Sequence, residues 1–149
     1  MTSFVAIAIR TANHKPTSIC HISLVVVRHG QLQERMSVDI ATPDTPHGAG
    51  RTKPTFLNAW RSIAPLIGNL PLVTYNGALC ESCLKSIFKL YGLPYPDFTF
   101  ICTYTVCRKL RFSPALPNYK LSTLAERCGI DPQNLSQAEC IAHIALKVL

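Results

Sequence analysis

Two continuous apolar runs, at residues 4–10 and 20–27, constrain the fold of this 149-residue chain more than any other feature. Runs of this length and character are typical of strands that are buried in a sheet. Between residues 32 and 40 the apolar side chains instead follow a two-residue alternation, which predicts a third strand. The pair His29-Gly30 marks a tight turn between the second and third strands. The chain therefore begins with three consecutive strands.

Helices and strands are then expected to alternate along the rest of the chain. Residues at helical spacing, expected to line two helices, are Phe56, Trp60, Ile63 and Ile67 in the first and Leu79, Cys83, Ile87 and Leu90 in the second. Further strands are predicted at 70–75 and 98–102, and further helices at 104–111, at 120–128 and from about 135 onward. This order predicts an α/β fold in which a five-stranded mixed sheet is flanked by helices. The length suits a single domain over residues 1–149.

The composition is that of a folded, water-soluble protein. Hydrophobic residues make up 48% of the chain and charged residues 15%, which argues against disorder. No apolar run approaches the roughly 20 residues that a membrane-spanning helix needs, and the N-terminus lacks the features of a signal peptide. We therefore expect a cytoplasmic protein that does not associate with membranes.

The charge balance is basic, with 15 Lys and Arg residues against eight Asp and Glu and a net charge of +7. Such an excess favours encounter with polyanions such as nucleic acid, although a generic basic surface carries the same charge. Basic residues are densest in one stretch that also holds aromatic residues: Arg108, Lys109, Arg111, Phe112, Tyr119 and Lys120. This mixture suits contacts with phosphates and stacked bases.

The chain holds seven cysteines, an odd number that favours reduced core thiols over a set of disulfides in a cytoplasmic protein. Cys80 and Cys83 form a C-x-x-C pair inside a helical pattern. A structural zinc ion needs four well-placed ligands, usually as two close pairs, so core packing is the simpler interpretation. Two alternatives stay open: a zinc site at Cys80 and Cys83, and a Cys80 nucleophile whose pKa is lowered by the start of a helix.

Several motifs, in the same order, resemble those of the DnaQ-like (DEDDh) 3′–5′ exonucleases over essentially the whole chain. Residues 4–13 are similar to the family's first-strand motif F-V-A-I-D-x-E-T-A-N, and residues 72–80 to its L-V-x-H-N-x-x-F-D. Cys102-Thr103 followed by Arg108 resembles C-T-x-x-x-x-R, and residues 117–124 resemble P-N-x-x-L-x-x-L. Shorter matches are found at 18–22, at His47-Gly48, at 53–56 and at Gly129-Ile130. The resemblance implies an RNase H-like exonuclease fold.

The resemblance also implies an active site in which four carboxylates hold two Mg²⁺ or Mn²⁺ ions and a histidine acts as general base. The five corresponding positions of this chain hold none of these residues; they are Ala8, Arg10, Cys80, Pro132 and Gln137. An arginine there opposes the binding of two dications. Glu81 and Asp131 are each one residue away from a required position, which on a helix turns the side chain by about 100°. We therefore expect no metal, no other cofactor and no catalytic residue.

The vacant positions predict a catalytically inactive exonuclease-like domain that binds nucleic acid, for example single-stranded ends, or serves as an accessory subunit. The candidate nucleic-acid contacts are Arg10, Thr11, Tyr75, Asn76, Arg108, Tyr119 and Lys120. Of these, Arg10 offers a guanidinium for a phosphate oxygen near the vacated metal position. Two alternatives stay open: a protein-interaction module of a polymerase or nuclease assembly, marked by an exposed apolar patch, and residual two-metal exonuclease activity.

Overall fold

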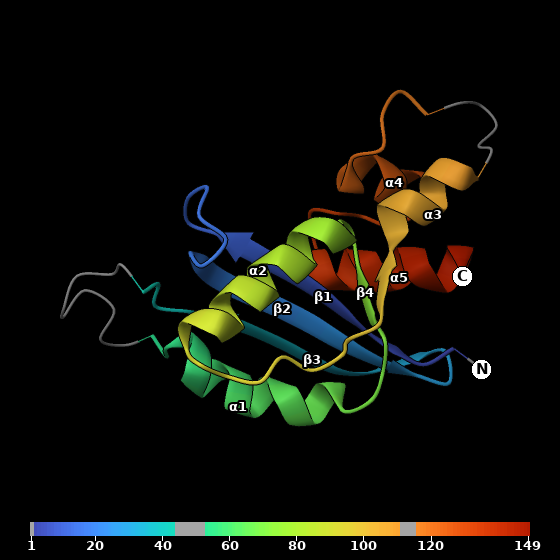
Figure 1. Cartoon of the computed structure of the whole chain (residues 1–149). Coiled ribbons are helices and arrows are strands. Elements are labelled where there is room, and N and C mark those ends of the chain that lie inside the picture. The colour runs from blue at the N-terminus through green and yellow to red at the C-terminus, as the bar shows by residue number, and fades with distance from the viewer. Residues whose placement is uncertain (1, 44–52, 111–115) are drawn as a thin grey trace.

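The computed structural model of the chain describes residues 2–43, 53–110 and 116–149, and its elements follow the predicted order (Figure 1). The strands are β1 (Phe4–Thr11), β2 (Ile19–Arg28), β3 (Gln31–Asp39), β4 (Leu72–Thr74) and β5 (Phe100–Cys102). The helices are α1 (Phe56–Ile67), α2 (Gly77–Leu90), α3 (Thr103–Lys109), α4 (Leu121–Arg127) and α5 (Gln137–Val148). None of these described helices combines the length and the apolar character that crossing a bilayer requires.

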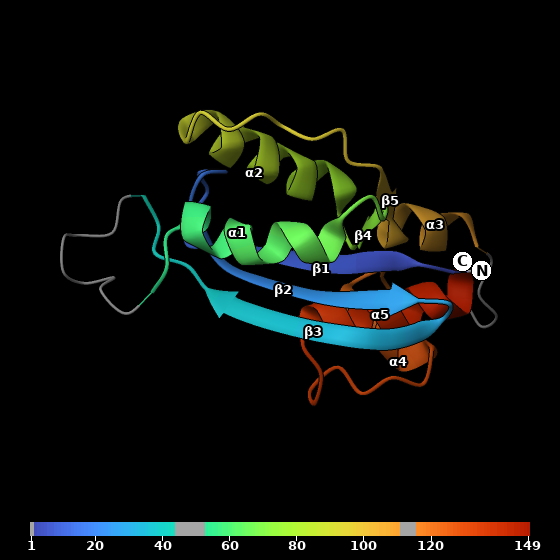
Figure 2. The same ribbon diagram turned by 90° about the horizontal axis from the view of Figure 1, so that it is seen from below.

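The five strands form one mixed sheet in the order β3-β2-β1-β4-β5. The first three strands pair antiparallel, as their short connections allow, whereas β4 joins β1 in parallel and β5 joins β4 in parallel. Helices α1 and α2 cover one face of this sheet, and α5 covers the other with α4 beside it (Figure 2). The predicted architecture of a five-stranded mixed sheet flanked by helices is therefore confirmed.

The central strand β1 divides the core because its side chains point alternately to the two faces. Val5 and Ile7 pack in the cluster formed with α1 and α2, and Phe4, Ala6 and Ala8 pack against α5. Both sets are almost completely buried. Burying a side chain such as Ile7 or Phe4 contributes about 1.5–3 kcal/mol. The continuous apolar run recognised in the sequence thus reflects a strand that is buried on both faces.

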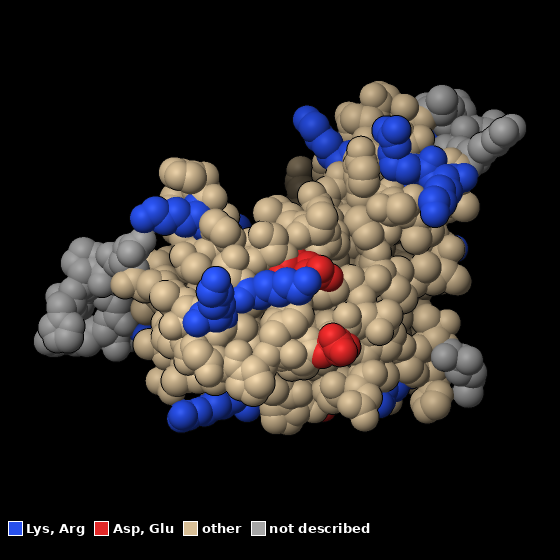
Figure 3. Space-filling model, in the orientation of Figure 1, with Lys and Arg blue, Asp and Glu red and all other residues tan. Residues whose placement is uncertain are grey.

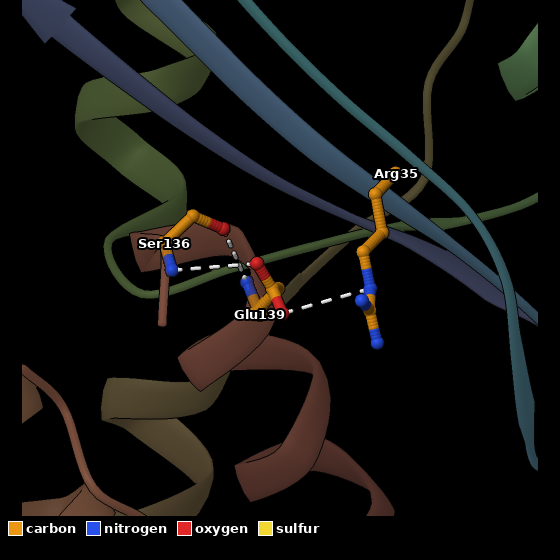
Figure 4. A network of polar contacts seen from close by, with 3 residues as sticks. All are labelled: Arg35, Ser136 and Glu139. Atoms are coloured by element: carbon orange, nitrogen blue, oxygen red, sulfur yellow. Dashed lines mark hydrogen bonds and ion pairs between the residues drawn. The ribbon is translucent and has the colours of Figure 1, made fainter. Parts of the chain in front are cut away.

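Helix α5 is held at its N-terminal end by two side chains (Figure 4). Ser136 caps the helix by accepting a hydrogen bond from the backbone N–H of Glu139, and the Glu139 carboxylate in turn accepts one from the backbone N–H of Ser136. The same carboxylate lies 3.6 Å from Nε of Arg35 on β3. The start of α5 is therefore fixed both to its own first turn and to the edge of the sheet.

The buried face of α2 differs from the prediction at both of its ends. Leu79 and Leu90 are 59% and 53% exposed, so the prediction that they line this helix with Cys83 and Ile87 is wrong. The core side of the helix is formed by Gly77, Cys80, Cys83, Leu84, Ile87 and Phe88. The predicted and the observed faces share Cys83 and Ile87, and the observed face continues through Cys80, Leu84 and Phe88 instead of Leu79 and Leu90.

Candidate functional site

A cavity of about 240 Å³ opens at the carboxyl ends of β1 and β4, between the N-terminal ends of α2 and α5. We call it the central pocket. Its lining residues are Ala8, Ile9, Thr11, Thr74, Tyr75, Asn76, Leu79, Cys80, Cys83, Leu121, Gln137 and Ile141. The pocket lies where the three apolar clusters of the protein meet, because its lining includes members of each.

Three of the five positions at which the resemblance requires catalytic residues line the central pocket: Ala8, Cys80 and Gln137. Pro132 lines an adjoining cavity that shares Leu121 and Gln137 with the central pocket. Ala8, Cys80 and Gln137, which are far apart in the sequence, are thus brought together in one pocket, with Pro132 in the cavity beside it. The fifth, Arg10, is exposed on β1 and is not part of the lining.

The residues of the central pocket do not fit two divalent metal ions. Its described lining offers hydroxyl, amide and thiol groups but no carboxylate or imidazole, whereas Mg²⁺ depends on carboxylates for binding and charge neutralisation. Glu139, which is close in sequence to Gln137, is already occupied by Ser136 and Arg35 (Figure 4). Across residues 2–43, 53–110 and 116–149, no three His, Cys, Asp or Glu side chains form a group that could hold a metal ion.

Cys80 is a buried thiol and not an activated nucleophile. Burial raises its pKa to about 12, and this effect outweighs the opposing hydrogen bond with Thr74. The hypothesis that the pKa of Cys80 is lowered at the start of α2 is therefore wrong, because burial disfavours the charged thiolate. Its neighbour Glu81 points elsewhere and pairs with Lys85 at 2.9 Å.

The pKa of Cys102, at the end of β5, is shifted in the opposite direction to that of Cys80. Its Sγ accepts a hydrogen bond from the backbone N–H of Gly77 at 3.4 Å and donates one to the carbonyl of Tyr75 at 3.2 Å. Burial raises the pKa of this thiol, but hydrogen bonds from the Thr105 hydroxyl and from the N–H groups of Gly77, Thr105 and Tyr104 outweigh it, so the pKa is lowered. A Cβ on Gly77 would lie 3.3 Å from that of Cys102, which favours glycine there.

Arg10 belongs to a row of polar residues that crosses three strands. It is paired with His21 on β2, which is paired with Asp39 on β3. Nδ1 of His21 donates a hydrogen bond to Oδ1 of Asp39 across 2.8 Å. This hydrogen bond holds the pKa of the Asp39 carboxyl below its usual value, and electrostatic interactions with His21, Lys53 and Arg10 act in the same direction. Arg10 thus lies in the field of a carboxylate, outside the central pocket.

Four side chains from three parts of the chain form what we call the tyrosine–arginine cluster: Tyr75, Tyr104 and Arg108 of α3, and Tyr119. The guanidinium carbon of Arg108 lies 5.1 Å from the ring centre of Tyr119 and 5.8 Å from that of Tyr104. The Tyr104 ring also contacts Tyr75, at 5.8 Å between ring centres. Because Tyr75 lines the central pocket, the cluster is continuous with it.

Tyr75 itself is held from two sides. Its hydroxyl donates a hydrogen bond to the backbone carbonyl of Tyr119, and its half-buried ring meets that of Tyr104 at a steep angle. Lys120 follows Tyr119 and is exposed at the start of α4. Lysine and arginine side chains gather over the part of the molecule that holds α3 and α4 (Figure 3). The aromatic cluster is therefore bordered by positive charge.

The structure brings six of the seven candidate contact residues into this region. Thr11, Tyr75 and Asn76 line the central pocket, while Arg108, Tyr119 and Lys120 belong to or adjoin the tyrosine–arginine cluster. Asn76 also caps α2, since its Oδ1 accepts a hydrogen bond from Leu79 N–H. Candidates that fall outside the described residues are Arg111 and Phe112 of the basic stretch and the His47-Gly48 match.

Sequence reasoning missed Tyr104, which joins the pocket side of the cluster to Arg108. The signal that could have found it is its position four residues before Arg108 in a predicted helix, since residues at this spacing lie on one helical face. The basic residue was recognised, but its aromatic partner was not.

No protein-family model and no curated protein matches the chain. Solved structures do match, and over 97% of its length. The nuclease domain of 3'hExo, a DEDDh family member bound to rAMP, matches with a TM-score of 0.70 and 16% identity over 90% of its own length. Exonuclease X in complex with 5′-overhanging duplex DNA has a TM-score of 0.68 and 18% identity over 89% of its length. Apo Exonuclease I has a TM-score of 0.74 and 14% identity over 41% of its length.

At these identities the similarity establishes the fold. The chain has the RNase H-like fold of the DEDDh exonuclease domains, as its motifs predicted. A shared fold does not carry a shared reaction, which depends on the residues at the site. The function has to be argued from the central pocket and the tyrosine–arginine cluster of this chain.

Proposed function

We propose that this exonuclease-fold domain binds single-stranded nucleic acid without cleaving it. The observation that carries the proposal is the tyrosine–arginine cluster beside the central pocket. Proteins that bind single strands combine aromatic side chains, on which bases stack, with basic side chains that follow the phosphates. The cluster offers both within one small surface. Two proteins of the same fold are bound to rAMP and to 5′-overhanging duplex DNA, which supports a nucleic-acid partner.

Arg108 is suited to a phosphate because its contacts with Tyr104 and Tyr119 are not hydrogen bonds. They hold the guanidinium in place while its N–H donors make no hydrogen bond to another described residue. Tyr104 is 38% exposed, which leaves part of this aromatic residue accessible to a ligand. Lys120, exposed beside Tyr119, supplies a second positive charge.

The proposed absence of cleavage rests on the lining of the central pocket. Hydrolysis by two metal ions requires ligands that neutralise and position both of them. Ala8, Cys80 and Gln137 provide no carboxylate, and the thiol of Cys80 stays protonated at neutral pH. We therefore assign no step of phosphodiester hydrolysis to this site.

The test is a titration of labelled single-stranded and double-stranded DNA and RNA with the purified protein in the presence of Mn²⁺. Fluorescence anisotropy measures binding, and a denaturing gel of the same samples measures strand length. We expect single strands to bind and to keep their length. Lack of binding at low salt would contradict the proposal, as would shortening of the strands in proportion to protein concentration.

Variants of three surface arginines test which of them contacts a phosphate of the bound strand. We expect Arg108→Ala to weaken binding about fivefold and to reduce the slope of log affinity against log salt by about 0.7, the value for one phosphate contact on a single strand. Arg10→Ala tests the candidate outside the cluster in the same way. Arg61→Ala, exposed on α1, is the matched control and should change neither quantity. Equal effects of all three variants would mean that only net charge matters.

The exposed apolar side chains do not favour a protein-interaction module as a second function. Among the described residues, the large ones are Leu79, Leu90, Tyr104, Leu110 and Leu149. Leu79 and Leu90 lie at opposite ends of the 14-residue helix α2, so these two do not form one patch. A docking surface would need them in one contiguous patch.

A further inference from the structure

The central pocket is uncharged although its surroundings are basic. Every described lining residue is either apolar or carries a neutral polar group. Three cations adjoin the lining without being part of it: Arg10 lies between Ile9 and Thr11 on β1, Lys120 precedes Leu121, and Arg108 contacts Tyr104, whose ring meets that of Tyr75. Positive charge is therefore available around the pocket but not within it.

This distribution decides which part of a nucleic-acid strand can enter. A phosphodiester that left water for the pocket would lose its hydration without meeting a cation, and burial of an unpaired charge is strongly unfavourable. An uncharged group meets no such penalty. The phosphates of a bound strand must stay outside, where Arg108 and Lys120 can reach them.

The size and the lining of the central pocket suit a planar ring. Its volume of about 240 Å³ exceeds that of a protein cavity of ~150 Å³ known to hold benzene. Ile9, Leu79 and the Tyr75 ring supply apolar surface, and Leu79 is exposed although it is a large apolar residue. Gln137 carries a side-chain amide, which combines donors and an acceptor as the edges of nucleobases do, and Asn76, whose Oδ1 caps α2, adds amide N–H donors.

We propose that the central pocket binds one unpaired nucleobase of the strand, while Arg108 and Lys120 hold the adjacent phosphates outside it. This inference rests on the proposed function and deepens it, because it names the group that enters the pocket. The place where the resemblance implies metal ions and a phosphate would hold a base instead. The cavity would then accept an uncharged base at the place where the resemblance implies charged groups.

An abasic scan tests the proposal on the unaltered protein. Single-stranded oligonucleotides of one length are prepared with one nucleoside at a time replaced by an abasic residue, so that their charge stays constant. We expect one position at which the missing base weakens binding about tenfold, as the loss of one stacked base does. The salt slope should stay unchanged there, since no phosphate is lost. Equal affinities at every position, with binding intact, would overturn this inference and leave the proposed function standing.

A variant tests the same point from the protein side. Gln137→Glu places a carboxylate in the pocket with almost no change in shape, and Gln133→Glu adds the same charge at an exposed position outside the lining. With a base in the pocket, only Gln137→Glu changes the order of affinity for the four bases at the sensitive position. Uniform weakening for all four bases by Gln137→Glu would place a phosphate in the pocket and contradict the proposal. If no oligonucleotide binds the native protein, the proposed function fails and this inference fails with it.

Discussion

At the scale of single residues, two thiols near the start of α2 differ in pKa for a clear physical reason. Cys80 faces the core, where burial raises its pKa to about 12. Cys102 lies on the neighbouring strand end, where several N–H groups and a hydroxyl stabilise the thiolate and lower its pKa. The number of hydrogen-bond donors around each sulfur matters more here than its distance from the end of a helix.

This difference predicts selective alkylation by iodoacetamide. We expect Cys102 to be labelled in the folded protein at neutral pH and Cys80 to be labelled only after unfolding, because the thiolate is the reactive form. Peptide mass spectrometry after timed labelling measures both rates in one sample, and Cys102→Ser identifies the Cys102 peptide. Equal rates at the two sites would contradict the assignment.

Asp39 predicts a pH dependence of stability whose direction follows from its lowered pKa. A carboxyl that is more acidic in the folded state stabilises the protein above its unfolded pKa, here 3.8, and loses this contribution as the pH falls through the folded value. We therefore expect Asp39→Asn to be less stable than the native protein near neutral pH and to converge with it below pH 3.8. Urea unfolding at a series of pH values measures the difference, which would stay constant if Asp39 had no partner.

At the scale of elements, α5 connects the core to the central pocket. Its inner face carries small residues, including Ala138, Ala142 and Ala145, that pack against Phe4 and the other residues of β1 on that face. Its first residue, Gln137, lines the pocket. The position of a pocket residue therefore depends on how the first turn of the helix is capped.

Ser136→Ala tests this dependence. Loss of the N-cap hydrogen bond should cost about 1 kcal/mol of unfolding free energy, and it should also weaken oligonucleotide binding because Gln137 follows the cap. Chemical denaturation and the anisotropy titration measure the two effects. Ser82→Ala, exposed in α2, is the control and should leave both almost unchanged. A stable Ser136→Ala variant would mean that the ion pair of Arg35 and Glu139 is enough to hold the helix.

At the scale of the whole molecule, the fold brings together three positions at which the resemblance implies catalytic residues, and none of the three holds a carboxylate or a histidine. Strand β1 and helices α2 and α5 bring Ala8, Cys80 and Gln137 to one pocket, although these residues are separated by many tens of positions in the chain. The backbone arrangement of the exonuclease fold is thus compatible with a pocket whose described lining has no carboxylate.

Introducing carboxylates at the positions that the resemblance assigns to metal ligands should therefore create metal binding. We expect the variant Ala8→Asp, Arg10→Glu, Cys80→Asp and Gln137→Asp to be less stable than the native protein in a chelator and to gain stability from millimolar Mn²⁺. The gain would be about 2.7 kcal/mol if the free metal reaches 100 times its dissociation constant. Thermal unfolding with and without Mn²⁺ measures it. The native protein should show no shift, and an equal shift there would contradict our interpretation of the pocket.

Much of this arrangement could be predicted from sequence because local patterns report local structure. The apolar runs and helical spacings identified the order of the elements, and the motif matches placed Ala8, Cys80 and Gln137 together. The exposure of Leu79 could not be predicted, since two faces of α2 have similar periodicity. The hydrogen bond from Tyr75 to Tyr119 joins residues 44 positions apart and leaves no periodic signal, so the tyrosine–arginine cluster was visible only in part.

The hydrogen bond between the Tyr75 hydroxyl and the Tyr119 carbonyl also has a thermodynamic consequence. A free tyrosine side chain loses rotational entropy when a ligand immobilises it, and that loss opposes binding. In this protein the rotation of Tyr75 is already restricted in the folded state. A base that stacks near this ring therefore meets a rigid surface. The side chain loses its rotational entropy when the protein folds, so binding of the base does not have to include that loss.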